Sequence, residues 1–205
     1  MTLALAPTAD DGRPARIGPN AILQVGDALR AAVGPARTRE LYEAAGLGAY
    51  LREPPSGMVD EREVMRLHGV LRARLPEPEL RRIAWTAGTT TGDYLLAHRI
   101  PRGAQHVLKA LPSSIASRLL LAAIGRHAWT FAGSGTFSAR AGHPVVVSIA
   151  DCPLCRGVRA GAPICGYYAA TFQRLYRVLV APGAVVVQTA CGACGDDACR
   201  FSIAW

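Results

Sequence analysis

The sequence predicts an α+β fold in which helices come first and a small antiparallel sheet, packed with a C-terminal helix, follows. Three observations support this class. Apolar residues recur at helical spacing in the first part of the chain, and short apolar runs separated by glycines replace them at about residue 126. All six cysteines lie after this change. A chain of 205 residues, half of them hydrophobic, suits one domain with a buried core.

The N-terminal residues 1–16 are rich in Pro, Asp, Gly and Ala and show no periodicity, which predicts a flexible lead-in. They carry acids early and no basic stretch before an apolar one, so we expect no signal peptide. A single domain is expected over 17–205, with a helical part over 17–125 and a sheet and cysteine-rich part over 126–205.

Helical spacing predicts the elements of the first part in order. The first helix is expected to end at Gly34-Pro35, and Asp60 with Glu63 resembles a capping box before a later helix. That helix is expected to end at Pro76 and Pro78. The predicted helices cover residues 20–33, 36–45, 60–75, 79–98 and 113–124.

The sequence of residues 126–205 predicts several strands and one helix. The stretch HAWTFAGSGTFSAR, residues 127–140, has aromatic residues separated by small ones and is expected to form a hairpin. Cys165 opens a helix expected to run to residue 180, with its apolar residues on one face. Strands are expected over 144–150, over 184–188 and from Cys199 onward.

The charge pattern argues against nucleic acid as a partner. The net charge is +8, and every basic residue except Lys109 is an arginine, but these residues are scattered rather than grouped in a block. The longest aliphatic run, residues 119–124, is far shorter than the roughly 20 residues that cross a bilayer. We therefore expect no transmembrane segment, and a cytoplasmic protein with reduced thiols.

The cysteines form two C-x-x-C pairs, Cys152/Cys155 and Cys191/Cys194. Both sulfurs of such a pair can face one ion, and zinc takes four ligands in a tetrahedron at about 2.3 Å for sulfur. The Gly-Asp-Asp segment before Cys199 is a natural turn that would return this residue to Cys191. Buried reduced thiols, an iron–sulfur cluster and a redox disulfide remain alternatives, because Cys also packs as a small hydrophobe.

A resemblance narrows these alternatives. The segment CGYYAATFQRLYRVLVAPGAVVVQTACGACGDDACRF resembles the C-terminal part of the 4-vinyl reductase domain family: a helix, a strand ending in Glu-x-x-Cys, a Gly-Asp turn and Cys-Arg-Phe. With CPLCRG and the YYAATF helix, the chain is most similar to the bacteriochlorophyll-synthesis members of purple photosynthetic bacteria. The likeness covers roughly residues 100–205.

The family's fold implies a ligand-binding domain related to vesicle-tethering subunits and often dimeric. In sensor members, zinc is held by the cysteine that opens the helix, by the glutamate and by two later cysteines. The resemblance carries these roles to Cys165, Cys191 and Cys199, while the glutamate position holds Gln188, a weaker zinc ligand. We expect Cys194 as the fourth ligand, with Cys155 as the alternative.

The resemblance implies a role in bacteriochlorophyll synthesis, either as a carrier of a divinyl protochlorophyllide or chlorophyllide, or as a reductase of its 8-vinyl (4-vinyl) group. GSGTFSA, which starts at Gly133, lacks the third glycine of a dinucleotide-binding motif, and no NAD(P) or flavin site is recognised. A reductase would therefore need an external electron donor. A small-molecule-sensing regulatory domain is a third possibility, but the sequence ends at Trp205 without the ATPase and DNA-binding modules of those relatives.

The carrier hypothesis suggests ligand-binding residues. Trp85, Trp129 and Phe131 are candidate walls for a flat apolar ring, and His106 and His127 are candidate ligands to its central magnesium. Each of these residues also has a simpler structural interpretation. A tryptophan in a strand usually belongs to the core, and a histidine at a helix end usually caps carbonyl groups. Expected partners are the tetrapyrrole, other bacteriochlorophyll-synthesis enzymes and a second copy of the chain, in the cytoplasm or at the periphery of the photosynthetic membrane.

Overall fold

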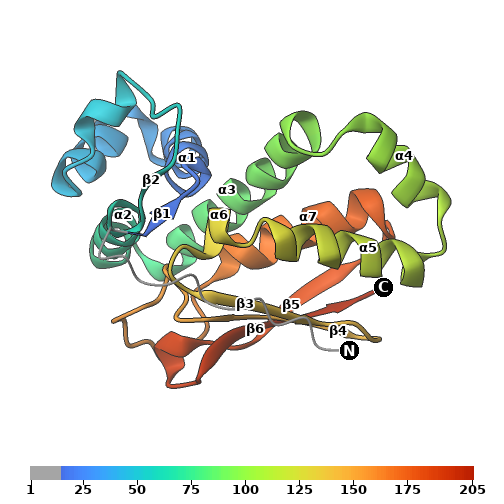
Figure 1. Ribbon diagram of the computed structural model, residues 1–205. Coiled ribbons are helices and arrows are strands. Elements are labelled where there is room, and N and C mark those ends of the chain that lie inside the picture. The colour runs from blue at the N-terminus through green and yellow to red at the C-terminus, as the bar shows by residue number, and fades with distance from the viewer. Residues whose placement is uncertain (1–14) are drawn as a thin grey trace.

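The computed structural model describes residues 15–205. The lead-in predicted over residues 1–16 lies outside the described residues except at its end, where Arg16 belongs to strand β1. The α+β class is confirmed: a helical layer built from the first part of the chain packs on a four-stranded antiparallel sheet and its helix (Figure 1). None of the helices among residues 15–205 is long and apolar enough to cross a membrane.

The first part of the chain, which forms the helical layer, also contains two short strands. Strand β1 (Arg16–Ile17) pairs with β2 (Val59–Asp60). Between them lie α1 (Asn20–Ala44) and the 3-10 helix η1 (Gly48–Leu51). Gly34 interrupts α1 with a φ of 79°, in the left-handed region that favours glycine, so the break predicted at Gly34-Pro35 is present.

Helix α2 (Glu61–Arg74) begins where the capping pattern predicted it. The Asp60 carboxylate accepts a hydrogen bond of 2.8 Å from the backbone N–H of Arg62. Glu63 does not close the box, because its carboxylate accepts a bond of 2.9 Å from the Tyr50 hydroxyl instead.

Proline marks the start of each of the next three helices, α3 (Glu77–His98), α4 (Arg102–Ala110) and α5 (Ser113–Arg126). Pro78 lies inside the first turn of α3, where its missing N–H has no helical partner to lose. Helix α4 was not predicted, because only Leu108 of its nine residues is buried and the apolar repeat is too short to detect.

The hairpin predicted over residues 127–140 is wrong in its first half. Residues Trp129–Ala132 form a short helix, α6, which ends at Gly133 with a φ of 59°. Thr130 and Phe131 donate their backbone N–H groups to His127 and Ala128, so the local carbonyls satisfy them rather than a strand. Only the second half is a strand, β3 (Thr136–Arg140).

The sheet has the order β3-β4-β6-β5, with β4 (Val145–Ala150), β5 (Val185–Ala190) and β6 (Ala198–Ala204) at the predicted places. Helix α7 (Gly166–Leu179), also predicted, and α5 lie over one face of the sheet (Figure 1). Every neighbouring strand pair is antiparallel, and Ile149 of β4 stands opposite Cys199 of β6.

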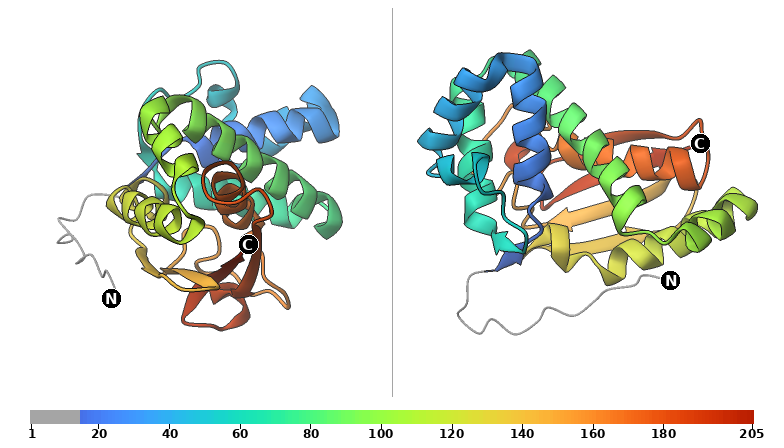
Figure 2. Two further views of the ribbon diagram at one scale, coloured as in Figure 1. Left: turned by 90° about the vertical axis from the view of Figure 1, so that its right-hand side faces the viewer. Right: turned by 90° about the horizontal axis from the view of Figure 1, so that it is seen from above.

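Helix α3 crosses α7 at close range and joins the helical layer to the sheet layer; both views of Figure 2 show the two helices side by side. The approach depends on Gly88, whose carbonyl accepts a bond of 2.9 Å from the Thr171 hydroxyl. A Cβ at this position would meet the Tyr167 carbonyl oxygen and would lie 2.8 Å from the Ala170 Cβ. Nearby, the Thr91 and Tyr167 hydroxyls are 2.8 Å apart and share a hydrogen bond.

The substitution Gly88→Ala is expected to lower the free energy of unfolding by about 1–3 kcal/mol, because the added methyl group forces two packed helices apart. Urea unfolding of the purified variant measures the change. Gly69→Ala on α2 is the matched control, since its Cβ meets nothing within 4 Å. It should stabilise the protein by up to about 1 kcal/mol through helix propensity, and equal effects of the two changes would contradict the packing argument.

Candidate metal centre

Four buried cysteines converge on one point of the structure: Cys152, Cys155, Cys165 and Cys199. Their sulfur atoms all lie within 4.8 Å of one another. The Sγ–Sγ distances are 3.3 Å from Cys155 to Cys199, 3.5 Å from Cys165 to Cys199 and 3.8 Å from Cys152 to Cys165.

Three separate segments bring these thiols together. Cys152 and Cys155 lie in the turn that follows β4, where the Cys155 N–H donates to the Cys152 carbonyl at 3.1 Å. Cys165 is the residue immediately before α7. Cys199 lies in β6, opposite the end of β4, so the pairing of the two strands places it beside the turn.

The sulfur spacing fits a tetrahedral thiolate site. Four sulfurs at about 2.3 Å from a central zinc are separated by about 3.8 Å from one another. Three of the six sulfur–sulfur separations are 3.3–3.8 Å and all six are within 4.8 Å, so they lie near this value. They are much longer than the disulfide bond of about 2.05 Å. All six cysteines are free thiols. The cluster can therefore hold a metal ion after small side-chain movements.

The structure brings together only part of the predicted ligand set. Cys165 and Cys199 are in the cluster, and so is Cys155, the predicted alternative. Cys191 is buried at its edge, with Sγ 3.9 Å from that of Cys199. Cys194, the expected fourth ligand, is exposed, because the 3-10 turn Gly192–Cys194 directs it away from the other sulfurs.

Sequence reasoning did not select Cys152, although its C-x-x-C spacing to Cys155 was a usable signal. Gln188, at the family's glutamate position, holds the backbone instead of facing an ion. Its amide oxygen accepts from the Cys165 N–H at 2.9 Å, and its amide nitrogen donates to the Ala190 carbonyl at 3.1 Å. Gln188 thereby fixes the start of α7, where Cys165 stands.

The thiols compete for protons at such short range. Hydrogen bonding from Cys152, and then from Cys165 and Cys199, strongly lowers the pKa of the Cys155 thiol. The complementary hydrogen bonds raise the pKa of Cys152 and of Cys165 well above the ordinary value. A cation bound at the centre would take the place of these protons, because thiolates are the metal-binding form.

Two arginines hold the turn that carries Cys152 and Cys155. Arg72 of α2 donates to the Leu154 carbonyl at 2.9 Å. Burial lowers the pKa of Arg72, and the nearby cysteines oppose that shift. Arg156 donates to the Glu61 carboxylate at 2.8 Å. The turn is thus tied to the helical layer by two independent contacts.

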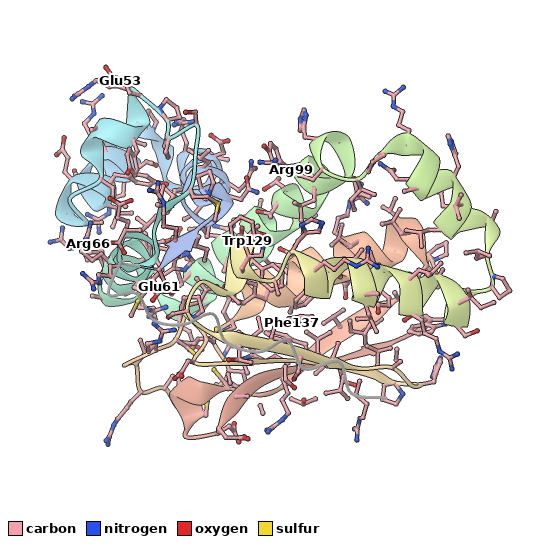
Figure 3. The ribbon with its side chains drawn as sticks, in the orientation of Figure 1. Glu53, Glu61, Arg66, Arg99, Trp129 and Phe137 are labelled. Atoms are coloured by element: carbon pink, nitrogen blue, oxygen red, sulfur yellow. The ribbon has the colours of Figure 1, made fainter. Side chains whose placement is uncertain are left out.

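Glu61, labelled at the start of α2 in Figure 3, is a buried carboxylate with three donors. Besides Arg156, the backbone N–H and the hydroxyl of Ser134 donate to it at 2.9 and 2.7 Å. Burial alone would raise the pKa of Glu61, but the hydrogen bonds from Ser134 and the Arg156 guanidinium outweigh burial and lower it. Glu61 and Arg72 have no sequence signal, because both reach the turn from the distant helix α2.

A surface hollow of about 170 Å³ gives access to the cluster. Cys155 and Cys199 lie on its wall, together with the carboxylates Asp196 and Asp197. The hollow is lined by three aspartates and by Arg156, and it offers a metal ion a route from solvent to the sulfurs.

The residues predicted to bind a tetrapyrrole lie in different places. Trp85 on α3 is exposed, and so is His106 on α4. Phe131 is partly buried against the core, and its ring centroid lies 5.6 Å from that of Phe137. His127 and Trp129 are both exposed at the junction of α5 and α6, where Figure 3 labels Trp129. None of the five lines the hollow beside the cysteines or a second hollow between α1 and α3.

The chain is similar to known proteins both in its cysteine-rich half and over most of its length. A family model for the 4-vinyl reductase domain matches residues 145–204, which include all four clustered thiols. The chain is 46% identical over 188 residues to the bacteriochlorophyll synthase 23 kDa chain of Cereibacter sphaeroides, covering 92% of this chain and 90% of that one. It is 39% identical over 196 residues to the protein of the same name in Rhodobacter capsulatus, covering 96% and 90%.

Among solved structures, a vinyl-4-reductase family protein from Methanocaldococcus jannaschii aligns with 68% of this chain and 88% of its own. The identity is 14% and the TM-score is 0.34.

The substitution Glu61→Gln is expected to lower the free energy of unfolding by about 1–3 kcal/mol at pH 7, because the Arg156 and Ser134 donors lose the charged acceptor that the buried Glu61 provides. The pKa of Glu61 is lowered in the folded state, so its contribution is complete above the ordinary value of about 4.3 and is lost as the pH falls through the folded-state pKa. The difference in the free energy of unfolding between wild type and variant should therefore become smaller in acid. Urea unfolding across this pH range measures it.

Glu77→Gln is the control for charge removal alone. Glu77 pairs with Arg81 on the exposed side of α3, and such surface pairs contribute at most about 1 kcal/mol. A Glu61→Gln protein as stable as this control at pH 7 would contradict the bracing role of Glu61.

Proposed function

The chain belongs to the family of bacteriochlorophyll synthase 23 kDa chains and carries a 4-vinyl reductase domain, and on this basis we propose that it is an accessory protein of bacteriochlorophyll synthesis that binds a tetrapyrrole intermediate. The observation that carries the proposal is the 46% identity over 92% of the chain. Identity of this extent, rather than a local motif, supports a shared role.

The proposed ligand is a protochlorophyllide or chlorophyllide, carried to other enzymes of the same synthesis. A flat apolar macrocycle is poorly soluble when free, so a protein that binds one of its faces would keep it in solution during transfer. The two hollows, of about 170 and 160 Å³, are smaller than the roughly 300–1,000 Å³ of sites that enclose a drug-sized ligand. We therefore place the ring against exposed aromatic surface, with Trp129 beside one face and His127 as a ligand to its magnesium.

We further propose that Cys152, Cys155, Cys165 and Cys199 bind one zinc ion. Four thiolates and no open position are the features of a structural zinc site, which stabilises a fold and does no chemistry. The ion would fasten the turn after β4 to β6 and to the start of α7. The same residues would accept other thiophilic ions, so metal analysis must identify the species.

One zinc per chain is expected after purification under reducing conditions with zinc in the medium. Elemental analysis should show most of it lost in Cys155→Ser and in Cys199→Ser, and a chelator should lower the melting temperature. Cys194→Ser is the matched control, because this thiol is exposed, and its zinc content should equal that of wild type. Wild-type protein without metal, or zinc lost only in the Cys194 variant, would contradict the assignment.

Adding protochlorophyllide to the wild-type protein should shift its absorption bands and saturate at one ring per chain. Trp129→Ala and His127→Ala should each weaken binding by about tenfold, the factor expected for one good ring contact. His143→Ala is the control, since the His143 ring packs against the Trp205 ring in another part of the molecule, with 4.7 Å between the ring centroids. Unchanged spectra would reject the carrier, whereas reduction of a divinyl substrate with NADPH alone would identify an enzyme.

A further inference from the structure

We propose that the outward face of α5, together with Trp129 of α6, docks on the surface of an anionic lipid bilayer. This inference goes beyond the proposed function and does not depend on tetrapyrrole binding, although both proposals use Trp129, which a ring and a bilayer would occupy in turn. It rests on the charge of one long segment of the chain and on the side chains that α5 leaves exposed.

The charge of the molecule is concentrated in one segment. Residues 94–150 contain six Arg or Lys and no Asp or Glu, so this segment supplies six of the eight net positive charges of the chain. Arg118 and Arg126 lie on α5, and Lys109 lies on α4, which contacts α5. All three are exposed, and none of them forms an ion pair with any part of residues 15–205. Their charges are available to phosphate groups.

Large apolar side chains stand among these charges. Ile115 and Leu119 are 45% and 49% exposed, and Trp129 is 58% exposed. Ile115, Leu119 and Arg126 are separated by four and seven residues, about one and two helical turns, and therefore share the outward face of α5. The opposite face is buried: Leu120 packs in the core, and the Ser117 hydroxyl lies 3.0 Å from that of Tyr176 on α7.

The helix is therefore a fixed part of the surface. Viewed from above, α5 and α6 follow one another along a single edge of the molecule, with the sheet and α7 behind them (Figure 2). Figure 3 places Trp129 on that edge. A flat partner can reach the whole length of such an edge at once.

The mixture of side chains favours lipid over nucleic acid. Helices that lie in a membrane interface insert Leu, Ile and Trp side chains below the headgroups and keep Arg and Lys among them. Each basic residue near an anionic leaflet contributes roughly 1 kcal/mol, which corresponds to about a fivefold change in binding. A nucleic-acid surface needs the arginines but has no use for exposed Ile115 and Leu119, which would face water there.

The test is sedimentation of the full chain, without pigment, with vesicles of equal parts phosphatidylcholine and phosphatidylglycerol. Binding is expected at low salt, with loss on phosphatidylcholine alone and weakening as salt screens the charges. The double variant Arg118→Glu/Arg126→Glu should lose at least about tenfold in binding. Ile115→Ser/Leu119→Ser should lose about as much at unchanged charge, because the two aliphatic side chains that would enter the bilayer are removed.

Two exposed positions elsewhere provide matched controls. Arg39→Glu on α1 and Val187→Ser on β5 alter an exposed charge and an apolar side chain away from α5, and both should bind as wild type does. Tryptophan emission should shift to shorter wavelength on vesicles, and Trp129→Phe should remove that shift.

Several outcomes would overturn the proposal. These are wild-type protein that stays in the supernatant at low salt, α5 variants that bind like the controls, and an emission shift that persists without Trp129. Capture of a DNA duplex in place of vesicles, lost in Arg118→Glu/Arg126→Glu, would assign the surface to nucleic acid. Because no pigment is present, a negative result leaves the carrier proposal standing, and a failed pigment titration leaves this one standing.

Discussion

The convergence of four buried thiols is the constraint on which the second half of the structure depends. Cys199 lies in a central strand, Cys165 precedes α7, and Cys152 and Cys155 lie in the turn after β4. A shift of β4 against β6 by one residue would turn Cys199 to the other face of the sheet. The strand register, the position of α7 and the path of the turn are therefore one linked arrangement.

The helical layer takes part in this arrangement although it contains no cysteine. Arg72 and Glu61, both on α2, hold the cysteine turn from outside, the first through a backbone carbonyl and the second through Arg156. The close crossing of α3 over α7 at Gly88 provides a second connection. Helices α2 and α3 thus connect the helical part of the chain to the cysteine-rich part.

Sequence patterns predicted the elements with strong periodicity, including α7, β4 and the helix pair separated at Gly34. They failed at Trp129, because aromatic residues separated by small ones follow neither helical nor strand spacing. Among the cysteines, C-x-x-C spacing identified pairs but not the direction in which each turn faces. Cys194 was therefore expected inside and is exposed, whereas Cys152 was passed over and is buried. Contacts such as Glu61 with Arg156 span 95 positions and leave no local pattern.

Helix α7 begins at the thiol cluster and ends beside α5. Its first neighbour is Cys165, and just past its other end the Val180 carbonyl accepts a hydrogen bond of 3.1 Å from Ser113, the first residue of α5. Fourteen residues at about 1.5 Å each give a length of about 21 Å. A rigid helix of this length keeps the sulfur atoms and the start of α5 at a constant separation. A tilt of α7 at the thiol cluster would therefore also move the start of α5.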